Sequence, residues 1–449
     1  MATEDESVDL LDPFRQFLSL ERDVLVLSLA MFAFSLGFQM TNRFLPDYMV
    51  ALGASGFVVG LFGTVGNVVS AVYPYPGGAI SDRMGSRYAL TLFGLISTAG
   101  FVFWLLAPGI GTISLGALVL EPWVWIFVGL LLAQAWKSFG LGATFAVVKQ
   151  ATEPSRLAAG FASTETFRRT AFLVGPVLAA VLIDLHPDFT MSFQYVLGAA
   201  VVFGVLGTVA QHFLYDASED TIGDSFEGID QIRRDLRDMP APLRPLLVGD
   251  TFVRFANGMV YAFFILVVTR FYEVGLDTTL ALGGFSYAID LSPQAFFGYL
   301  LGVEMLVALL TMIPAAKVAE RVGLKPIVAL GFAVYGVFPV VLIYAPEVLS
   351  PYLSLSGVMV LVFAFSGLRF AGLPSHKALI VGPAERGAGG RVTGTYYLLR
   401  NTVVIPSAAL GGYLWDFVNP EVAFSVAAVI GVLGTGYFLV FGQEFEAYA

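Results

Sequence analysis

Five charged residues of this chain lie inside long apolar stretches, where an ionisable side chain is costly and usually has a function. They are Glu304, Lys137, Arg369, Arg168 and Arg400. Buried cations are suited to binding an anion, and a carboxylate placed among cations is suited to taking up and releasing a proton. The pattern therefore predicts a buried site for a small charged solute. The alternative is that these cations only pack helices together or close a gate, and the sequence leaves both interpretations open.

A short charged motif occurs twice and shows that the chain contains an internal repeat. The same offset, 320 − 82 = 238, relates the charged pair of the first copy to that of the second, and it also carries Gly60 to Gly298. A repeat of this length indicates two related halves. The motif residues are Gly78, Asp82, Arg83, Gly85 and Arg87 in the first copy, and Glu320, Arg321, Gly323 and Lys325 in the second.

The repeat also pairs the buried cations. An offset of 369 − 137 = 232 carries Lys137 to Arg369, and the same offset carries Arg168 to Arg400. Each cation lies some 10 residues from an end of its apolar stretch, which is a depth of about 15 Å at about 1.5 Å per residue. Glu304 has no such counterpart, because 304 − 238 = 66 and residue 66 is a glycine. We expect this unmatched carboxylate to face a nearby Arg or Lys and to carry the proton.

Three further pairs of opposite charge stand three or four residues apart, a spacing that brings side chains together on one helix face. They are Glu165 with Arg168, Asp250 with Arg254, and Arg43 with Asp47. Other reactive groups are few. The chain has no cysteine, and its three histidines lack metal-ligand spacing, so we expect no metal site and no cofactor.

The composition is that of a membrane protein. Hydrophobic residues make up 57% of the 449 positions and charged residues only 13%, whereas soluble proteins have about 25% charged residues. Apolar stretches long enough to cross a bilayer recur along the whole length. We predict twelve spanning helices, at 24–51, 56–80, 87–107, 121–149, 157–184, 190–215, 247–272, 292–319, 325–346, 353–380, 389–416 and 420–442.

These spans predict the domain organisation and the orientation. Residues 1–23 form an acidic N-terminal segment, 24–215 and 247–442 form two six-helix halves, 216–246 form a charged linker, and 443–449 form a short tail. Basic residues gather in alternate connections, including both motif loops and the linker. Because such loops stay on the cytoplasmic side, we expect both termini in the cytoplasm. The net charge of −10 and the lack of a basic patch argue against nucleic acid as a partner.

With twelve spans, two halves and this motif, the chain resembles the major facilitator superfamily over nearly its whole length. The family signature Gly-x-x-x-Asp-Arg-x-Gly-x-Arg matches Gly78 to Arg87, whereas the second copy departs from it at Glu320. The resemblance implies two six-helix bundles that rock about a central site, with the motif loops as a latch on the cytoplasmic side. Gly175 and Pro176 resemble part of a second family motif, for which a helix kink with close packing is the favoured interpretation.

We therefore expect an all-α, multi-pass transporter of the cell membrane, not an enzyme, driven by a gradient and working by alternating access. No phosphate-binding loop for ATP is present in the sequence. The expected partners are a small-molecule substrate, a coupling proton and the lipid bilayer, and the expected state is a monomer. Transport of a small organic anion and efflux of amphipathic compounds both remain open. The rival class is a non-transporting member of the family, such as a sensor or an assembly factor.

Overall fold

The computed structural model describes residues 22–73, 80, 83–116, 118–139, 157–214, 237, 239–282, 285–381 and 389–444, and this part of the chain is mainly helical. The helices of the first half are α2 (Arg22–Thr41), α3 (Leu45–Ala51), α4 (Gly56–Val72), α6 (Ser86–Ile110), α7 (Val124–Gln134) with the π-helical turn η1 (Ala135–Phe139), α9 (Leu157–Ile183) and α10 (Phe189–Leu214). Those of the second half are α12 (Leu243–Val260), α13 (Phe264–Leu266), α14 (Pro293–Val322), α15 (Leu324–Leu349), α16 (Leu355–Gly367), α17 (Leu373–Val381), α18 (Gly389–Val404), α19 (Ser407–Phe417) and α20 (Pro420–Phe441).

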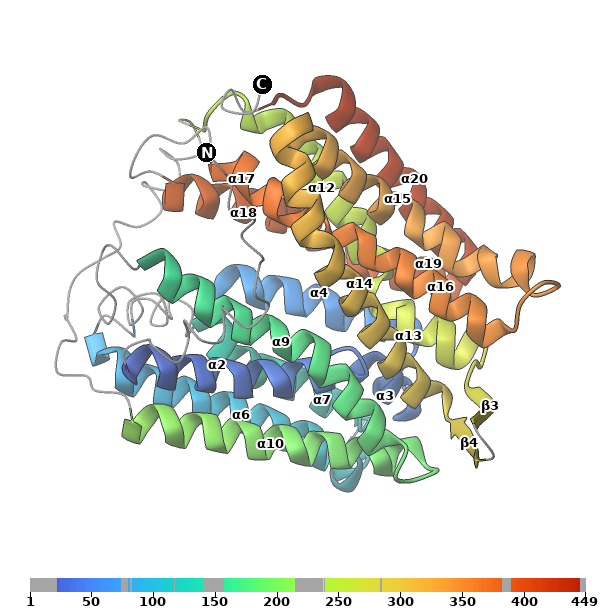
Figure 1. Cartoon of the computed structure of the whole chain (residues 1–449). Coiled ribbons are helices and arrows are strands. Elements are labelled where there is room, and N and C mark those ends of the chain that lie inside the picture. The colour runs from blue at the N-terminus through green and yellow to red at the C-terminus, as the bar shows by residue number, and fades with distance from the viewer. Residues whose placement is uncertain are drawn as a thin grey trace.

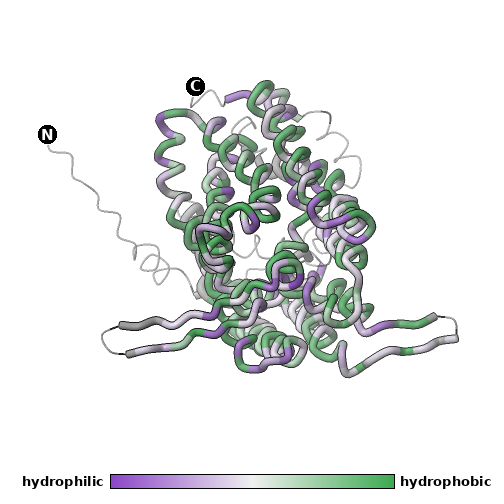
Figure 2. The backbone as a smooth tube through the Cα atoms, turned by 90° about the vertical axis from the view of Figure 1, so that its right-hand side faces the viewer, coloured by the Kyte–Doolittle hydropathy of each residue, from purple (hydrophilic) through white to green (hydrophobic). Residues whose placement is uncertain are grey.

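Short irregular helices and two hairpins complete the described elements. The 3-10 turns η2 (Tyr261–Phe263) and η4 (Leu368–Phe370) and the π-helical turn η3 (Val267–Phe271) interrupt longer helices. Strands β1 (Ile113–Leu115) and β2 (Leu118–Leu120) form one antiparallel hairpin, and β3 (Leu276–Leu282) and β4 (Phe285–Leu291) form the other. Seen from the end that carries them, the two hairpins project to opposite sides of the molecule (Figure 2).

Helices lie where the apolar stretches predicted them. Within the described residues, seven helices are long and apolar enough to cross a membrane, and four shorter apolar helices coincide with the predicted spans one, two, four and five. The predicted span 389–416 is built from α18 and α19, which meet at Pro406. The predicted span 24–51 is likewise divided, since α2 ends at Thr41 and α3 begins at Leu45.

The two halves of the chain form two groups of helices that converge toward one end of the molecule (Figure 1). We call this the hairpin end, because both hairpins lie there, and the opposite end, where α10 ends and α12 begins, the linker end. The groups meet along two seams, one between α4 and α19 and the other between α9 and α14. Toward the linker end the described helices of the two groups diverge (Figure 1).

Both seams depend on glycines that the repeat relates to each other. A Cβ atom on Gly60 of α4 would contact the carbonyl oxygen of Ala408 and lie 3.0 Å from the Cα of Gly412. A Cβ atom on Gly298 of α14 would lie 2.6 Å from the carbonyl oxygen of Pro176. Since 408 − 176 = 232 and 298 − 60 = 238, the contacts are equivalent in the two halves. Small residues at these positions let the helix backbones touch.

The described parts of the two motif loops also adopt matching backbone conformations. Gly85 has φ 81° and ψ 154° directly before α6, and Gly323 has φ 92° and ψ 165° directly before α15. Positive φ values of this kind are open to glycine and strained for other residues, which explains why both copies keep a glycine there. Arg83, Glu320 and Arg321 are exposed. The backbone N–H of Lys325 donates to the Glu444 carboxylate (2.8 Å). Gly78 and Asp82 lie outside the described residues.

The core of the first half is aromatic. Tyr48, Trp104 and Phe193 are fully buried, and the rings of Tyr48 and Phe193 lie 4.8 Å apart. The polar atoms of these side chains are satisfied by backbone carbonyls, because the Trp104 indole donates to Ile126 (2.9 Å) and the Tyr48 hydroxyl donates to Trp104 (3.3 Å). Aromatic side chains with a satisfied polar tip combine a large buried area with a fixed orientation.

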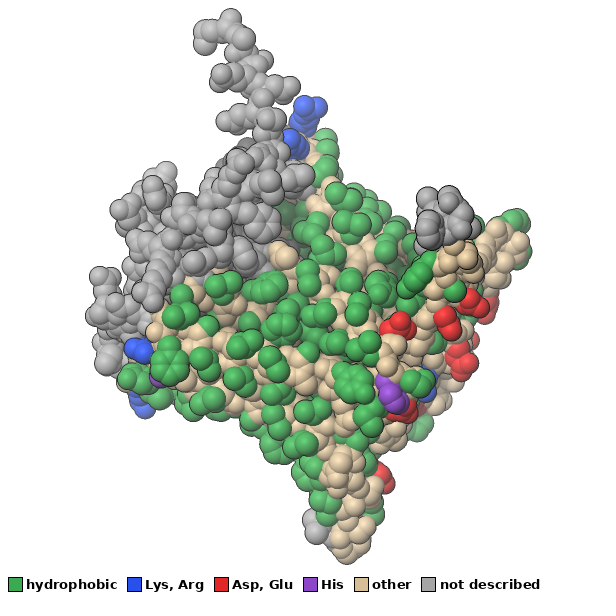
Figure 3. All heavy atoms as spheres, turned by 60° about the horizontal axis from the view of Figure 1, so that its bottom comes forward, with side chains coloured by type: hydrophobic (Ala, Val, Ile, Leu, Met, Phe, Trp, Pro, Cys, Tyr) green, Lys and Arg blue, Asp and Glu red, His purple; other side chains and the backbone are tan. Residues whose placement is uncertain are grey.

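One face of the molecule carries an apolar band between two charged rims (Figure 3). On the face seen in Figure 3, hydrophobic side chains cover the broad middle, Lys and Arg gather toward the linker end, and Asp and Glu gather toward the hairpin end. Large apolar side chains that are exposed in the described part of the chain include Leu206, Phe213, Leu310, Leu433 and Val440. An exposed apolar surface of this extent is expected where lipid, not water, surrounds a protein.

Candidate functional site

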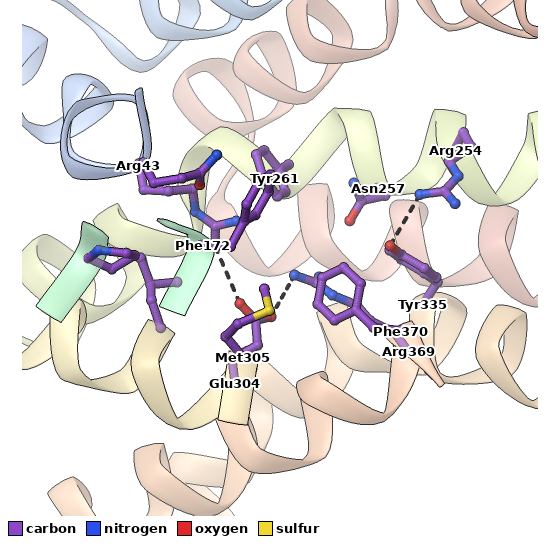
Figure 4. Close-up of a pocket in the computed structure, with 13 residues that line it drawn as sticks. Arg43, Phe172, Arg254, Asn257, Tyr261, Glu304, Met305, Tyr335, Arg369 and Phe370 are labelled. Carbon is purple, nitrogen blue, oxygen red and sulfur yellow. Dashed lines mark hydrogen bonds and ion pairs between the residues drawn. The ribbon is translucent and has the colours of Figure 1, made fainter. Parts of the chain in front are cut away.

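A cavity of about 280 Å³ lies between the two groups of helices. Its walls come from α2, the turn after α2 and α9 of the first half and from α12, η2, α14, α15 and η4 of the second. Charged and aromatic side chains point into it from opposite sides (Figure 4). The charged and tyrosine side chains that line it are Arg43, Arg254, Tyr261, Glu304, Tyr335 and Arg369.

Glu304 of α14 lines this cavity and is only 3% exposed. Its Oε1 atom accepts hydrogen bonds from Arg369 Nη2 and from Ser366 Oγ, both at 2.5 Å. Both donors belong to the same half as Glu304. A buried carboxylate needs a partner charge and hydrogen bonds, and Arg369 and Ser366 supply both to Glu304.

Arg43 reaches the cavity from the other half. It follows α2, and its guanidinium lies 4.2 Å from the centre of the Tyr261 ring, a cation–π contact. Its Nη2 atom lies 4.0 Å from Glu304 Oε2, which is an ion pair without a hydrogen bond. Glu304 therefore faces one arginine from each half.

Arg369 is enclosed by aromatic rings. Its guanidinium carbon lies 4.8 Å from the ring centre of Phe370 and 5.2 Å from that of Tyr335, with Phe264 and Phe338 slightly farther away. The residue is 2% exposed, and its Nε and Nη1 atoms have no hydrogen-bond partner among the described residues. Buried donors are rarely left without an acceptor, and the aromatic rings around this guanidinium provide cation–π contacts on the sides where no hydrogen bond is made.

A second charged cluster, formed around Asp250 of α12, adjoins the cavity through Arg254. The Asp250 carboxylate is fully buried and accepts hydrogen bonds from Arg254 Nε (3.2 Å), Arg400 Nη1 (3.0 Å) and the Tyr396 hydroxyl (3.0 Å). His376 Nε2 lies 3.3 Å from the same carboxylate. Arg254 also donates to the Tyr335 hydroxyl (3.1 Å), which faces the cavity. One carboxylate thus faces two arginines.

The hairpin end of the cavity is closed by polar contacts between the halves. Asp47 of α3 is fully buried and accepts hydrogen bonds from Arg270 Nε (2.7 Å) and Gln294 Nε2 (2.9 Å) of the second half. The Asp416 carboxylate of α19 accepts from the backbone N–H groups of Gly56 (3.1 Å) and Phe57 (2.6 Å), at the start of α4. A carboxylate at a helix N-terminus is favoured by the orphan N–H groups and by the helix dipole.

Comparison with known proteins assigns this architecture. The family model of the Major Facilitator Superfamily matches residues 27–290, which is more than half of the chain. The chain belongs to this superfamily. An uncharacterized MFS-type transporter of Methanocaldococcus jannaschii is 21% identical over 94% of this chain and 95% of its own length. A putative uncharacterized MFS-type transporter of Mycobacterium tuberculosis is 31% identical over 43% of this chain and 42% of its own length.

Solved structures share the fold of this superfamily member. A POT family transporter in complex with 5-aminolevulinic acid has a TM-score of 0.69 at 13% identity, covering 95% of this chain and 99% of that one. The nucleoside transporter NupG has a TM-score of 0.66 at 13% identity, covering 94% of this chain and 99% of that one. At such identities the likeness concerns the fold.

The fold of this chain brings together some of the predicted site residues and separates others. Glu304 and Arg369 meet in the cavity, and Arg400 belongs to the cluster around Asp250. Lys137, the repeat counterpart of Arg369, is instead exposed, with its Nζ atom 6.0 Å from the centre of the Phe38 ring. The helix that carries Arg168 is described, but its side chain lies outside the described residues. The functional roles of all five stay predictions.

Two of the local charge pairs can be compared with the structure. Asp250 and Arg254 do pair on one face of α12 (3.2 Å). The pairing suggested by the spacing of Arg43 and Asp47 is wrong: Asp47 binds Arg270, and Arg43 turns into the cavity. The chain turns between α2 and α3 at this point, so the helical spacing that would place the two side chains together is interrupted.

Several residues of the cavity and of the adjoining cluster around Asp250 were not predicted from the sequence. Gln39 and Tyr335 are a common polar and a common aromatic residue of apolar stretches, and His376 was only one of three scattered histidines. Gly175 and Pro176 prove to lie in a packing contact, because a Cβ atom on Gly175 would lie 2.7 Å from Gln39 and the Pro176 carbonyl contacts Gly298. A helix kink at this site stays a prediction.

Proposed function

We propose that this protein is a secondary transporter that moves a small solute across a membrane by alternating access. The observation that carries the proposal is the cavity between the halves, in which Glu304 faces Arg369 from its own half and Arg43 from the other. In this conformation the halves are joined at the hairpin end and diverge toward the linker end (Figure 1). Rocking about the cavity would exchange which end is closed.

We further propose the membrane arrangement of the transporter. Twelve spans form the bundles 24–215 and 247–442, which move as bodies about the cavity, and the linker 216–246 connects them. The linker end faces the cytoplasm, since the rim that carries Lys and Arg lies there on the face shown in Figure 3. Both termini are then cytoplasmic, the membrane is the cell membrane and the unit of function is a monomer.

We also propose that transport is coupled to protons through Glu304. When the carboxylate is ionised, it attracts Arg43 across the interface between the halves; when it is protonated, that attraction is lost while Arg369 keeps its own charge. Protonation would therefore weaken a contact between the halves at the level of the cavity. The motif loops, with Asp82 and Arg83 in one copy and Glu320 and Arg321 in the other, would close the linker end in the opposite conformation.

The test is the Glu304→Gln variant in proteoliposomes, with a solute identified beforehand by a thermal-shift screen of metabolites and drugs. We expect the variant to lose proton-driven accumulation and to keep solute exchange, because Gln keeps the shape but cannot ionise. Glu347→Gln, an exposed glutamate of α15, is the matched control and should behave as the unmodified protein. Active, pH-dependent transport by Glu304→Gln would refute the coupling mechanism.

A further inference from the structure

We propose that the cavity binds a small organic dianion, with one oxyanion group at Arg43 and the other at Arg254. The proposal deepens the proposed function by naming the chemical class of the solute, and it rests on that function only in taking this cavity as the solute site. It is argued from the charges that the described residues leave uncompensated, from their unsatisfied donors and from the shape of the site.

The charges that the described side chains place around the cavity do not balance. The cations that line it or join it through Asp250 are Arg43, Arg254, Arg369 and Arg400, and the carboxylates that face them are Glu304 and Asp250. Among the described residues, these four positive and two negative charges leave an excess of 4 − 2 = +2, and His376, which also lies beside Asp250, is left out of the count. Uncompensated charge is costly where water is excluded. A ligand of charge −2 would restore neutrality, whereas a cation would increase the excess.

The excess can be assigned to particular residues. Glu304 balances the charge of Arg369 through a direct hydrogen bond. Arg43 lies 4.0 Å from the same carboxylate, and one carboxylate cannot also balance the charge of this second arginine. Arg254 and Arg400 share the single carboxylate of Asp250 in the same way. Each carboxylate thus faces one arginine too many. Of those arginines, Arg43 and Arg254 line the cavity.

Unsatisfied donors point to the same ligand chemistry. Arg43 has about nine-tenths of its side chain buried, and its Nη2 atom has no hydrogen-bond partner among the described residues. Nε and Nη1 of Arg369, whose side chain is 1% exposed, likewise have no hydrogen-bond partner among the described residues. Guanidinium groups have donors and no acceptors, so only an acceptor can satisfy them, and a carboxylate or phosphate does so with two parallel bonds.

The shape of the site selects a short molecule with charge at both ends. Arg43 with Tyr261 and Arg254 with Tyr335 lie at opposite sides of the close-up, and Glu304 and Arg369 lie between them (Figure 4). The volume of about 280 Å³ is at the lower end of the range of ligand pockets, about 300–1,000 Å³, and therefore suits a compact solute. Arg43 belongs to the first half and Arg254 to the second, so such a dianion would bridge the halves.

The test uses matched aromatic probes on the purified full-length protein in detergent, by thermal shift and isothermal titration calorimetry. The probes are terephthalate as the dianion, benzoate as the monoanion, terephthalamide as the neutral analogue and p-xylylenediamine as the dication. We expect terephthalate to stabilise the protein and to bind at least tenfold more tightly than benzoate, and the other two not to bind. Equal binding of the diamide or diamine, or no binding of terephthalate at millimolar concentration, would overturn the proposal.

Variants locate the binding. Arg43→Gln and Arg254→Gln should each weaken terephthalate binding at least tenfold, whereas Arg244→Gln, an exposed arginine of the same helix as Arg254, should leave it unchanged. Unchanged binding in both cavity variants would contradict the assignment. Should either variant fail to fold, Glu304→Gln tests the proposal through the opposite change in affinity. It removes a competing negative charge and frees Arg369, so terephthalate should bind more tightly than to the parent protein. Weaker binding in that variant would count against the proposal.

The binding experiment and the transport experiment can refute their two proposals independently of each other. Binding is measured at equilibrium in detergent and needs no gradient, no membrane and no movement of the halves. A protein that binds terephthalate but transports nothing would keep the solute class and reject the transport proposal. A protein with proton-driven transport of a neutral solute and without affinity for terephthalate would do the reverse.

Discussion

The contact between Asp47 and the second half offers the most direct test of the conformational argument. The Asp47 carboxylate is fully buried and bonds Arg270 (2.7 Å) and Gln294 (2.9 Å), and both partners lie across the interface. These bonds can exist only while the hairpin end is closed. Replacing Asp47 with Asn keeps the size of the side chain but removes its charge and one of its acceptor atoms. The variant should therefore destabilise the closed hairpin end specifically.

The magnitude follows from the two bonds. A hydrogen bond to a charged group contributes about 1.5–3 kcal/mol. Because the Arg270 side chain is 44% exposed, solvent screens its bond to Asp47, and the contribution of that bond lies at the lower end of this range. A loss of about 1.5 kcal/mol for the closed conformation changes the ratio of the two conformations roughly tenfold. The population open at the hairpin end should rise by that factor in Asp47→Asn.

The assay is the distance distribution between two spin labels, measured by pulsed electron paramagnetic resonance. The chain has no cysteine, so labels can be attached to introduced cysteines without removing any native thiol. Leu185→Cys and Val348→Cys place exposed labels at the hairpin ends of the first and second halves. In Asp47→Asn the distribution should gain a longer component at the expense of the shorter one.

The control for this prediction is Asp277→Asn. Asp277 lies on strand β3 of the hairpin, opposite Asp290, and not in the interface between the halves. The same chemical change at this position should leave the distance distribution as it is in the parent protein. An unchanged distribution in Asp47→Asn, or the same change in both variants, would refute the role given to the buried contact.

Two further predictions concern packing and buried charge. Gly60→Ala should weaken the seam between α4 and α19 by about 1–3 kcal/mol, because its Cβ atom would collide with the backbone of α19. It should also lengthen the distance between the two spin labels. Gly66→Ala, on the same helix but with open space around it, should do neither, and equal effects of the two variants would contradict the role given to Gly60. Asp250→Asn should lower the unfolding free energy by about 3–5 kcal/mol, because Arg254 and Arg400 would face each other without a carboxylate, and an unchanged melting temperature in detergent would contradict this.

Much of the fold could be predicted from the sequence because membrane spans are a local property. A helix that crosses a bilayer must satisfy its own backbone hydrogen bonds and present an apolar surface, so the apolar stretches alone locate the helices. The internal repeat added information about packing. Its offset carries Gly60 to Gly298, and in the structure both glycines make the same kind of close helix contact between the halves.

The candidate site was predicted only in part, since its members come from separate helices. The offset that pairs Lys137 with Arg369 is a correct statement about the repeat, but the two halves use these positions differently: one cation is exposed and the other is buried against Glu304. A repeat relates backbone positions, whereas the charge that a side chain faces depends on residues that are not repeated. Glu304 is such a residue.

The sequence by itself determined that this is a two-half membrane protein with a buried glutamate and buried arginines, because hydropathy, repeats and helical spacing are properties of neighbouring residues. It also determined the pair formed by Asp250 and Arg254, four residues apart on one helix. Only the tertiary structure decided that Glu304 bonds Arg369, 65 residues away, and that Arg43 enters the cavity while Asp47 binds Arg270, 223 residues away. Those choices depend on how helices rotate and approach one another, and that is determined by the packing of the whole bundle.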